Sequence, residues 1–275
     1  MKSKALIGLL ALVGLTSVSH ASLVYAVDVR NQRFLTFDTL TPGTQTVLAT
    51  GYNTPYFGLD FNAAATNLYG IRNTVTGGPM VLDQLSLANG SVLGSVGITG
   101  HAAGAGITGL AFDSANNAYM STFTTGIGSE LYSLNTTTGA ASLIGNMHAT
   151  NIVIDISVSS TGQMVAHDIS TDAFHNVNTG TGAMTLIGNH GLAANFAQGM
   201  DFDWSNNTLY AAVYTGGGTL TYGSVNLGTG AVTSIPGILS GEYEMAVQQA
   251  VPEPASLAAL GLGALALLRR RKKTS

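Results

Sequence analysis

Short apolar segments alternate with polar turns along the chain, and one such arrangement recurs. It is clearest in GMDFDWSNNTLYAAV, residues 199–213, where an apolar strand, a turn rich in Asp and Asn and a second apolar strand follow one another. Related first strands begin roughly every 45 residues, a repeat length typical of β-propellers with several short strands per unit. They are GLDF from Gly58, GLAF from Gly109, DISV from Asp155, GMDF from Gly199 and EMAV from Glu244.

Each unit divides into short strands, as the third unit illustrates. Its strands are GLAFD (109–113), NAYMSTF (117–123), ELYSLN (130–135) and ASLIGN (141–146). Segments of this length that alternate in polarity and are separated by Gly, Asn and Thr turns indicate β-sheet. Because no sustained helical period occurs between residues 22 and 250, the sequence predicts an all-β domain.

The first unit lacks its first strand. LVYAVD (23–28), FLTFDTL (34–40) and TQTVLATG (44–51) correspond to second, third and fourth strands, and EMAVQQ (244–249) can supply the missing one. A C-terminal strand that completes an N-terminal blade closes the ring and removes two sheet edges. The sequence therefore predicts a five-bladed β-propeller closed by its C-terminal strand, with an open β-solenoid as the structural alternative.

Loop lengths separate two faces of this propeller. The turns between first and second strands are short, and Asp113 and Asp203 begin two of them, where a carboxylate can cap the backbone of the turn. The ligand series of a calcium loop is incomplete in both turns. The loops that lead into first strands are longer, and functional residues usually lie on such loops. We therefore expect a functional site on this long-loop face.

Both ends of the chain are predicted to be targeting segments. Lys2 and Lys4 precede an apolar run (residues 5–18) and the small-x-small tripeptide Ser19-His20-Ala21. This order predicts a signal peptide over residues 1–21, with a retained membrane anchor as the alternative. The predicted propeller domain then covers residues 22–250, and residues 251–275 form a C-terminal signal.

The C-terminal signal has three parts. Pro252, Glu253 and Pro254 precede an apolar run at residues 255–268, and five basic residues follow: Arg269, Arg270, Arg271, Lys272 and Lys273. The run is short for a membrane span, and its basic flank favours the cytoplasmic side. The pattern predicts transient insertion of a C-terminal helix into the inner membrane of an exporting cell.

These three parts together resemble the PEP-CTERM sorting signal of Gram-negative bacteria. The resemblance implies recognition by an exosortase, cleavage near Pro-Glu-Pro, and release or attachment at the cell surface of bacteria that make exopolysaccharide. An ordinary tail anchor is the alternative. The body resembles an uncharacterised family of secreted bacterial repeat proteins in GLDF…LYGI and LYSLNTTTGAASLIG, which implies a propeller and no particular activity.

Charge and cysteine content exclude several functions. Between residues 22 and 250 the chain has three arginines, no lysine and thirteen acidic residues, a net charge of −10. Such a body repels nucleic-acid phosphates and anionic membranes. The chain has no cysteine, which excludes disulfides, thiolate catalysis and zinc–thiolate sites.

Three histidines lie at equivalent places in long loops: His101, His148 and His190. If they converge at the channel mouth they could bind zinc or copper, the one cofactor that the sequence suggests. Asp155, His167 and Asp168 could add ligands or acid–base groups. The alternative is that these are ordinary polar residues, in a protein without a cofactor.

Carboxylates on first strands suggest a second kind of chemistry. Asp60, Asp155, Asp201 and Glu244 could hydrolyse a glycoside if two of them lie at the required separation. Several aromatic residues near the long-loop face, Tyr56 among them, could stack on a sugar; they are Tyr52, Tyr56, Phe57, Phe196, Tyr214, Tyr222 and Tyr243. GAGITG (104–109) matches a dinucleotide fingerprint but opens no predicted helix, so it indicates a flexible loop.

Taken together, these features favour a non-catalytic, surface-sorted binding or matrix protein. Its expected partner is extracellular polysaccharide or another envelope protein, in a biofilm setting. Tyr56, Asp155, His167 and Asp168 are the candidate ligand-binding residues. The alternatives are a propeller enzyme, either metal-dependent or carboxylate-based, and a purely structural biofilm protein.

Overall fold

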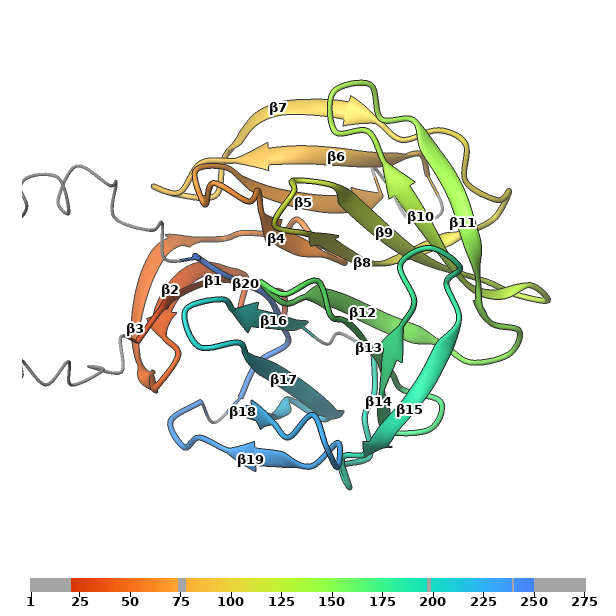
Figure 1. Ribbon diagram of the computed structural model, residues 1–275. Helices are drawn as coiled ribbons and strands as arrows, with labels where there is room; N and C mark the ends of the chain where they lie inside the picture. Colours follow the sequence, from red (N-terminus) through yellow and green to blue (C-terminus); the bar gives the residue numbers. More distant parts are fainter. Residues whose placement is uncertain (1–20, 74–77, 197–198, 239, 250–275) are drawn as a thin grey trace, which may run out of the picture.

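A computed structural model describes residues 21–73, 78–196, 199–238 and 240–249. Within these ranges the chain forms five four-stranded antiparallel sheets around a common axis, shown in Figure 1. The predicted five-bladed β-propeller is therefore confirmed. The predicted signal peptide (residues 1–21) and sorting signal (residues 251–275) lie outside the described ranges, apart from Ala21.

The blades follow one another along the sequence and are numbered in that order. Blade 1 contains β20 (Tyr243–Val247), β1 (Leu23–Asp28), β2 (Arg33–Asp38) and β3 (Thr41–Thr50). Blade 2 contains β4 (Leu59–Phe61), β5 (Leu68–Asn73), β6 (Met80–Leu85) and β7 (Val92–Gly97). Blade 3 contains β8 (Gly106–Phe112), β9 (Ala118–Thr124), β10 (Gly128–Leu134) and β11 (Ala141–His148). Blade 4 contains β12 (Val153–Val158), β13 (Met164–Asp168), β14 (Ala173–Val177) and β15 (Met184–Asn189), and blade 5 contains β16 (Gly199–Asp203), β17 (Thr208–Gly216), β18 (Thr219–Val225) and β19 (Val232–Ser234).

The C-terminal strand closes the ring as predicted. β20 pairs antiparallel with β1, with a register that runs from Val24 opposite Val247 to Asp28 opposite Tyr243. One blade is therefore built from both ends of the described chain. This pairing covers the inner edge of β1 and holds the ring shut without a covalent bond.

The innermost strands pack directly against one another around the axis, in the order β20, β4, β8, β12 and β16. A glycine within or next to three of these strands, at the first position of the repeated motif, permits the close approach. A Cβ on Gly109 would lie 2.8 Å from the amide nitrogen of Ile156, and one on Gly199 would lie 2.5 Å from the Tyr243 carbonyl oxygen. Gly58 meets the backbone of Leu110 in the same way. The recurring Gly-x-x-Phe pattern thus has a packing cause.

The hydrophobic core lies between neighbouring blades. Each of its five clusters combines side chains from two adjacent sheets. The fourth position of the first-strand motif supplies one buried apolar side chain per blade: Phe61, Phe112, Val158, Phe202 and Val247. Burial of such side chains is the main favourable term in folding, so no blade is expected to be stable alone.

Glycine contacts also join neighbouring blades at the periphery. The turns before the outer strands of blades 3, 4 and 5 end in Gly139, Gly182 and Gly230, each with φ between 73° and 77°. These turns pack against the outer strand of the preceding blade; Gly182, for example, meets the backbone of Gly145. Only glycine adopts this φ without strain while leaving room for a neighbouring backbone.

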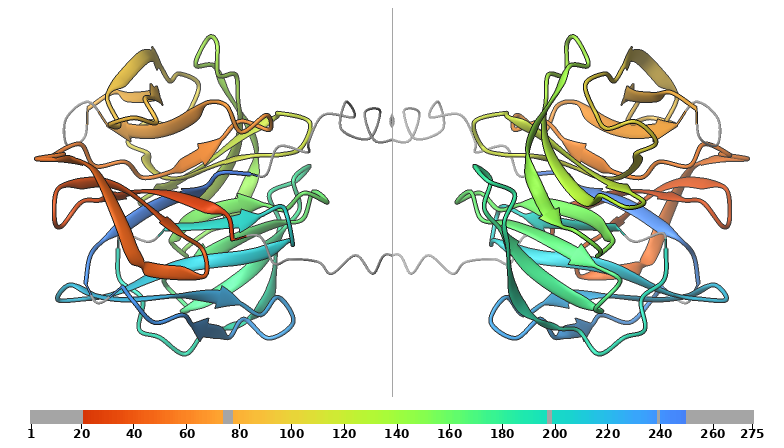
Figure 2. Two further views of the ribbon diagram at one scale, coloured as in Figure 1. Left: turned by 90° about the vertical axis from the view of Figure 1, so that its left-hand side faces the viewer. Right: turned by 90° about the vertical axis from the view of Figure 1, so that its right-hand side faces the viewer.

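The two faces of the ring differ in the lengths of their loops, as predicted. Figure 2 adds two views of the ring, turned by 90° either way from the view of Figure 1. The first–second turns are short, and Asp113 Oδ1 accepts hydrogen bonds from the amides of Ala115 (3.0 Å) and Asn117 (2.8 Å). At the end of the described chain, Gln249 Nε2 donates to the Phe202 carbonyl (2.7 Å), and Gln249 Oε1 accepts from Trp204 N (2.8 Å). The chain that follows β20 therefore leaves from this short-turn face.

Candidate functional site: a pocket at the channel mouth

A pocket of about 340 Å³ opens on the long-loop face, where the innermost strands begin. Loops before β4 and β16, the first residues of β8 and β12, the end of β9 and the start of β20 all contribute to it. We call it the mouth pocket and define it by the following residues: Phe57, Ile107, Thr108, Phe123, Ile154, Phe196, Glu242 and Glu244. Its volume is at the lower end of the range of small-ligand sites.

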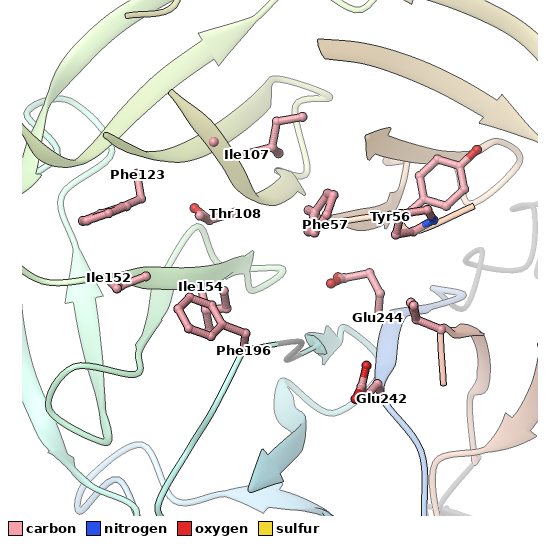
Figure 3. Close-up of a pocket in the computed structure, with 13 residues that line it drawn as sticks. Tyr56, Phe57, Ile107, Thr108, Phe123, Ile152, Ile154, Phe196, Glu242 and Glu244 are labelled. Carbon is pink, nitrogen blue, oxygen red and sulfur yellow. The ribbon is translucent and has the colours of Figure 1, made fainter. Parts of the chain in front are cut away.

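Most of the pocket wall is apolar. Ile107 and Ile154 come from neighbouring first strands and are buried, and Phe123 covers the side between them (Figure 3). Two phenyl rings at the rim remain accessible to solvent: Phe57 is 37% exposed and Phe196 is 59% exposed. Exposed rings beside a concave apolar wall are typical of binding surfaces.

The polar side of the pocket is formed by two glutamates, Glu242 just before β20 and Glu244 within it. Glu244 is only 6% exposed, and its carboxyl group points into the pocket, as Figure 3 shows. Its Oε1 accepts one long hydrogen bond from Leu59 N, at 3.3 Å. Burial raises the pKa of Glu244, with the nearby Asp201 carboxyl adding to the effect. The half-buried Glu242 lies beside it.

The other three first-strand carboxyls join blades to one another. Phe112 N donates to Asp60 Oδ2 (2.6 Å), Met200 N to Asp155 Oδ2 (2.7 Å) and Val247 N to Asp201 Oδ2 (2.7 Å). In each case the donor lies on the next innermost strand around the ring, whose amides have no β-ladder partner on that side. Buried amides require acceptors, and these carboxyls provide them.

The second oxygen of each of these three carboxyls accepts a hydrogen bond from the amide of the following residue. These bonds come from Phe61 (2.6 Å), Ile156 (2.8 Å) and Phe202 (2.8 Å). Burial raises the pKa of all three, that of Asp201 to about 7. Asp155, a candidate ligand-binding residue, thus lies in the inter-blade contact with both oxygens engaged. Of the four carboxyls considered for glycoside hydrolysis, Glu244 alone lines the mouth pocket.

The three loop histidines have different neighbours. His190 Nε2 lies 3.1 Å from Nε2 of His167, and both rings contact Phe174. His101 Nδ1 lies 3.0 Å from the Ala102 carbonyl oxygen, and the exposed His148 lines a separate surface pocket between β11 and β15. Across the described residues, no three His, Cys, Asp or Glu side chains are grouped so that they could hold a metal ion.

The remaining candidate residues, Tyr56 and Asp168, are held by local hydrogen bonds. Tyr56 contributes to the pocket lining, but its ring points away, and its hydroxyl donates to Asp83 Oδ2 at 2.8 Å. Asp168 caps the turn after β13, where it accepts from Ser170 N (2.8 Å) and Thr171 Oγ1 (2.7 Å). Neither of the two carboxylates, Asp83 and Asp168, lines the mouth pocket.

Sequence reasoning missed several residues of the pocket wall. β8 begins at Gly106, three residues before the predicted strand, because residues 106 and 107 pair with the long strand β9. This extension carries Ile107 into the pocket. GAGITG therefore runs from a loop into a strand. Ile107, Phe123 and Ile154 resemble any other core residue in sequence, so no local signal marks them.

At the C-terminus, residues 250–272 match the family model of the PEP-CTERM protein-sorting motif. The chain carries a PEP-CTERM sorting motif. Proteins with this motif are exported, are processed by an exosortase and are sorted to the cell surface. Curated proteins gave no match to the PEP-CTERM chain. Within the described ranges no helix is long and apolar enough to span a membrane, and the predicted sorting helix at residues 255–268 lies outside them.

Solved structures match the body of this PEP-CTERM protein. A protein of unknown function from Bacteroides caccae has 11% identity and a TM-score of 0.52, with 83% of this chain and 99% of that chain covered. A chain of the nidogen/laminin complex has 13% identity and a TM-score of 0.51, covering 84% and 100%. TolB from Acinetobacter baumannii has 11% identity and a TM-score of 0.50, covering 84% and 67%. At these identities the likeness shows the fold alone.

Proposed function

We propose that this PEP-CTERM protein is a non-catalytic binding module at the cell surface, and that the mouth pocket receives an apolar group of another envelope protein. One observation carries the proposal: an apolar pocket with two accessible phenyl rings lies on the long-loop face of a rigid ring. Burying one apolar side chain contributes roughly 1.5–3 kcal/mol. A single such contact is modest, so specific binding also requires the surrounding loops.

The lining favours a protein partner over polysaccharide. A buried sugar ring needs a hydrogen-bond partner for most of its hydroxyl groups. The pocket offers few: Thr108 already shares its hydroxyl with Ser121 (2.9 Å), which leaves mainly the carboxyls of Glu242 and Glu244. Polysaccharide binding is therefore the alternative outcome of the experiment below.

The same geometry favours binding over glycoside hydrolysis. Hydrolysis needs two carboxyl groups on opposite sides of the scissile bond. Asp60, Asp155 and Asp201 have both oxygens engaged by backbone amides, while Glu242 and Glu244 both lie at the start of β20, on one side of the pocket. This arrangement suits recognition of a group better than attack from two faces.

Site-directed photocrosslinking in cells of the producing bacterium tests the proposal. A benzophenone amino acid replaces Phe196 at the pocket rim or, as control, Leu186, which is 63% exposed on outer strand β15. We expect one envelope protein, identified by mass spectrometry, to crosslink at position 196 and not at 186. Phe57→Ala should weaken this crosslink several-fold. Leu93→Ala, which removes an exposed side chain on outer strand β7 outside the pocket, should leave it unchanged.

Two results would overturn the proposal. One is an identical crosslinking pattern from positions 196 and 186. The other is binding of purified exopolysaccharide to residues 22–250 that is lost in Phe57→Ala. This result would assign the pocket to a glycan.

A further inference from the structure

The mouth pocket combines its apolar wall with an acidic side that has no positive partner. Glu242 and Glu244 both line it, and neither forms an ion pair within the described residues. Two of the three arginines of the body are used elsewhere: Arg33 pairs with Asp28 and Arg72 with Asp83, each at 2.6 Å. The third, the exposed Arg30, packs its guanidinium over Gly218.

Glu244 is the least satisfied of the four buried first-strand carboxyls. Asp60, Asp155 and Asp201 each accept amide hydrogen bonds of 2.6–2.8 Å on both oxygens. Glu244 accepts a hydrogen bond of 3.3 Å from Leu59 N and a second one from the amide of Met245. A buried carboxyl that lacks strong partners costs free energy. A donor or cation that enters the pocket would remove part of this cost.

The opposite wall determines the chemistry that the rest of the ligand must have. Phe57, Phe123 and Phe196 surround the space into which the Glu244 carboxyl points (Figure 3). A group that fills the pocket must therefore present apolar surface to these rings and positive charge to the glutamates. Aromatic faces also attract ammonium groups, and a body of net charge −10 attracts cations over a longer range.

We infer that the mouth pocket binds a primary ammonium group carried on an apolar or aromatic body. The inference rests on the proposed function, because it specifies the chemistry of the group that the partner inserts. The amino terminus of a protein that begins with an aromatic or aliphatic residue has this chemistry. The Glu244 carboxyl, which burial keeps protonated in the empty pocket, releases its proton to solvent when the cation enters and then accepts the ammonium hydrogen bonds. Glu242 adds negative charge, and the phenyl rings bury the body.

Three probes of nearly equal shape test the inference: 2-phenylethylamine, which is cationic, 2-phenylethanol, which is neutral, and 3-phenylpropionate, which is anionic. Their affinities for residues 22–250 are measured by NMR titration at pH 7.5. We expect the amine to bind about tenfold more tightly than the alcohol, and the carboxylate most weakly. In Glu244→Gln the advantage of the amine over the alcohol should fall to about twofold or less, while the alcohol still binds.

Matched variants separate charge from folding. Gln at position 244 keeps the oxygen that accepts from Leu59 N, so the ring should remain closed. Glu242→Gln removes the second carboxylate of the pocket, at a half-buried position. Glu130→Gln alters another buried glutamate, outside the mouth pocket, and should leave the amine preference unchanged.

The outcomes distinguish this inference from the proposed function. Equal binding of amine and alcohol, or an amine preference that survives in both Glu244→Gln and Glu242→Gln, overturns the inference and leaves the pocket as an apolar site. If no probe binds while Phe57→Ala still weakens the crosslink at position 196, the ammonium inference fails and the proposed function stands. If no probe binds and Phe57→Ala does not weaken the crosslink at position 196, both the ammonium inference and the proposed function are wrong.

Discussion

Single glycines set how closely the innermost strands approach. Gly109 has no room for a side chain, because a Cβ there would meet Ile156 N at 2.8 Å and Asp155 Oδ1 at 2.9 Å. Both neighbours belong to the backbone or to a buried carboxyl held by two hydrogen bonds, so neither can move freely. The first-strand glycine is therefore a packing requirement of the ring, independent of any ligand.

Gly109→Ala is predicted to destabilise the fold by about 1–3 kcal/mol, the usual cost of overpacking a core. Gly94→Ala is the matched control, since nothing lies within 4 Å of a Cβ at that position on outer strand β7. Urea unfolding of residues 22–250 measures both. Equal stability of the two variants would contradict the packing role assigned to Gly109.

The directions of individual side chains explain why the site was only partly predictable from sequence. Neighbouring residues in one loop point in different directions: Phe57 faces the mouth pocket, whereas the ring of Tyr56 turns to Asp83. His190 lies in the loop that was predicted to matter, but its ring pairs with His167. Side-chain direction depends on contacts between blades, and the repeat pattern in the sequence gives no information about those contacts.

Among the strands, β20 differs from the other innermost strands because it joins a blade from the far end of the chain. Tyr243, Met245 and Val247 lie in the core cluster between blades 1 and 5, and Ala246 lies in the cluster between blades 1 and 2. Val247 N also satisfies Asp201. Loss of β20 would therefore open two blade interfaces and expose an edge of β1.

A chain that ends at Glu242 is predicted to lose the cooperative fold, whereas one that ends at Gln249 should keep it. Thermal unfolding followed by circular dichroism and the dispersion of amide NMR signals measure the difference. Addition of a peptide that covers residues 243–249 should restore part of the signal dispersion, because the missing strand pairs non-covalently with β1. A cooperative transition in the shorter chain would show that four complete blades and one three-stranded blade suffice.

The strands themselves were largely predictable from sequence. The repeat spacing gave the number of blades, and the missing first strand of unit one predicted the pairing of β20 with β1. Alternating polarity and turn residues placed nearly all strand cores. The early start of β8 was missed, because Gly106 and Ile107 belong to a strand only through their pairing with β9.

Across the whole molecule, buried carboxyls in four blades make stability depend on pH. Burial raises the pKa of Asp60, Asp155, Asp201 and Glu244, that of Asp201 to about 7. The folded state therefore holds protons that the unfolded state has released, and its stability falls as pH rises through the folded pKa values. His167 and His190 have lowered pKa values, also from burial, so they act in the opposite sense and mainly below about pH 7.5.

The free energy of unfolding is accordingly predicted to decrease between about pH 7.5 and pH 9, a range in which histidines are largely neutral in both states. In Glu244→Gln the decrease should be smaller, because one of the protons released on unfolding is absent. Urea unfolding at several pH values gives both slopes. A flat profile in the original sequence would contradict burial as the cause of the raised pKa values.

The direction of β20 has a consequence for how the molecule stands on a cell. This strand begins beside the mouth pocket at Glu244, and the described chain ends on the opposite face at Gln249, where the sorting segment starts. A body held through its C-terminus therefore turns the short-turn face toward its support and the pocket toward the medium. In that orientation the pocket would stay open to the medium, even where many copies stand close together.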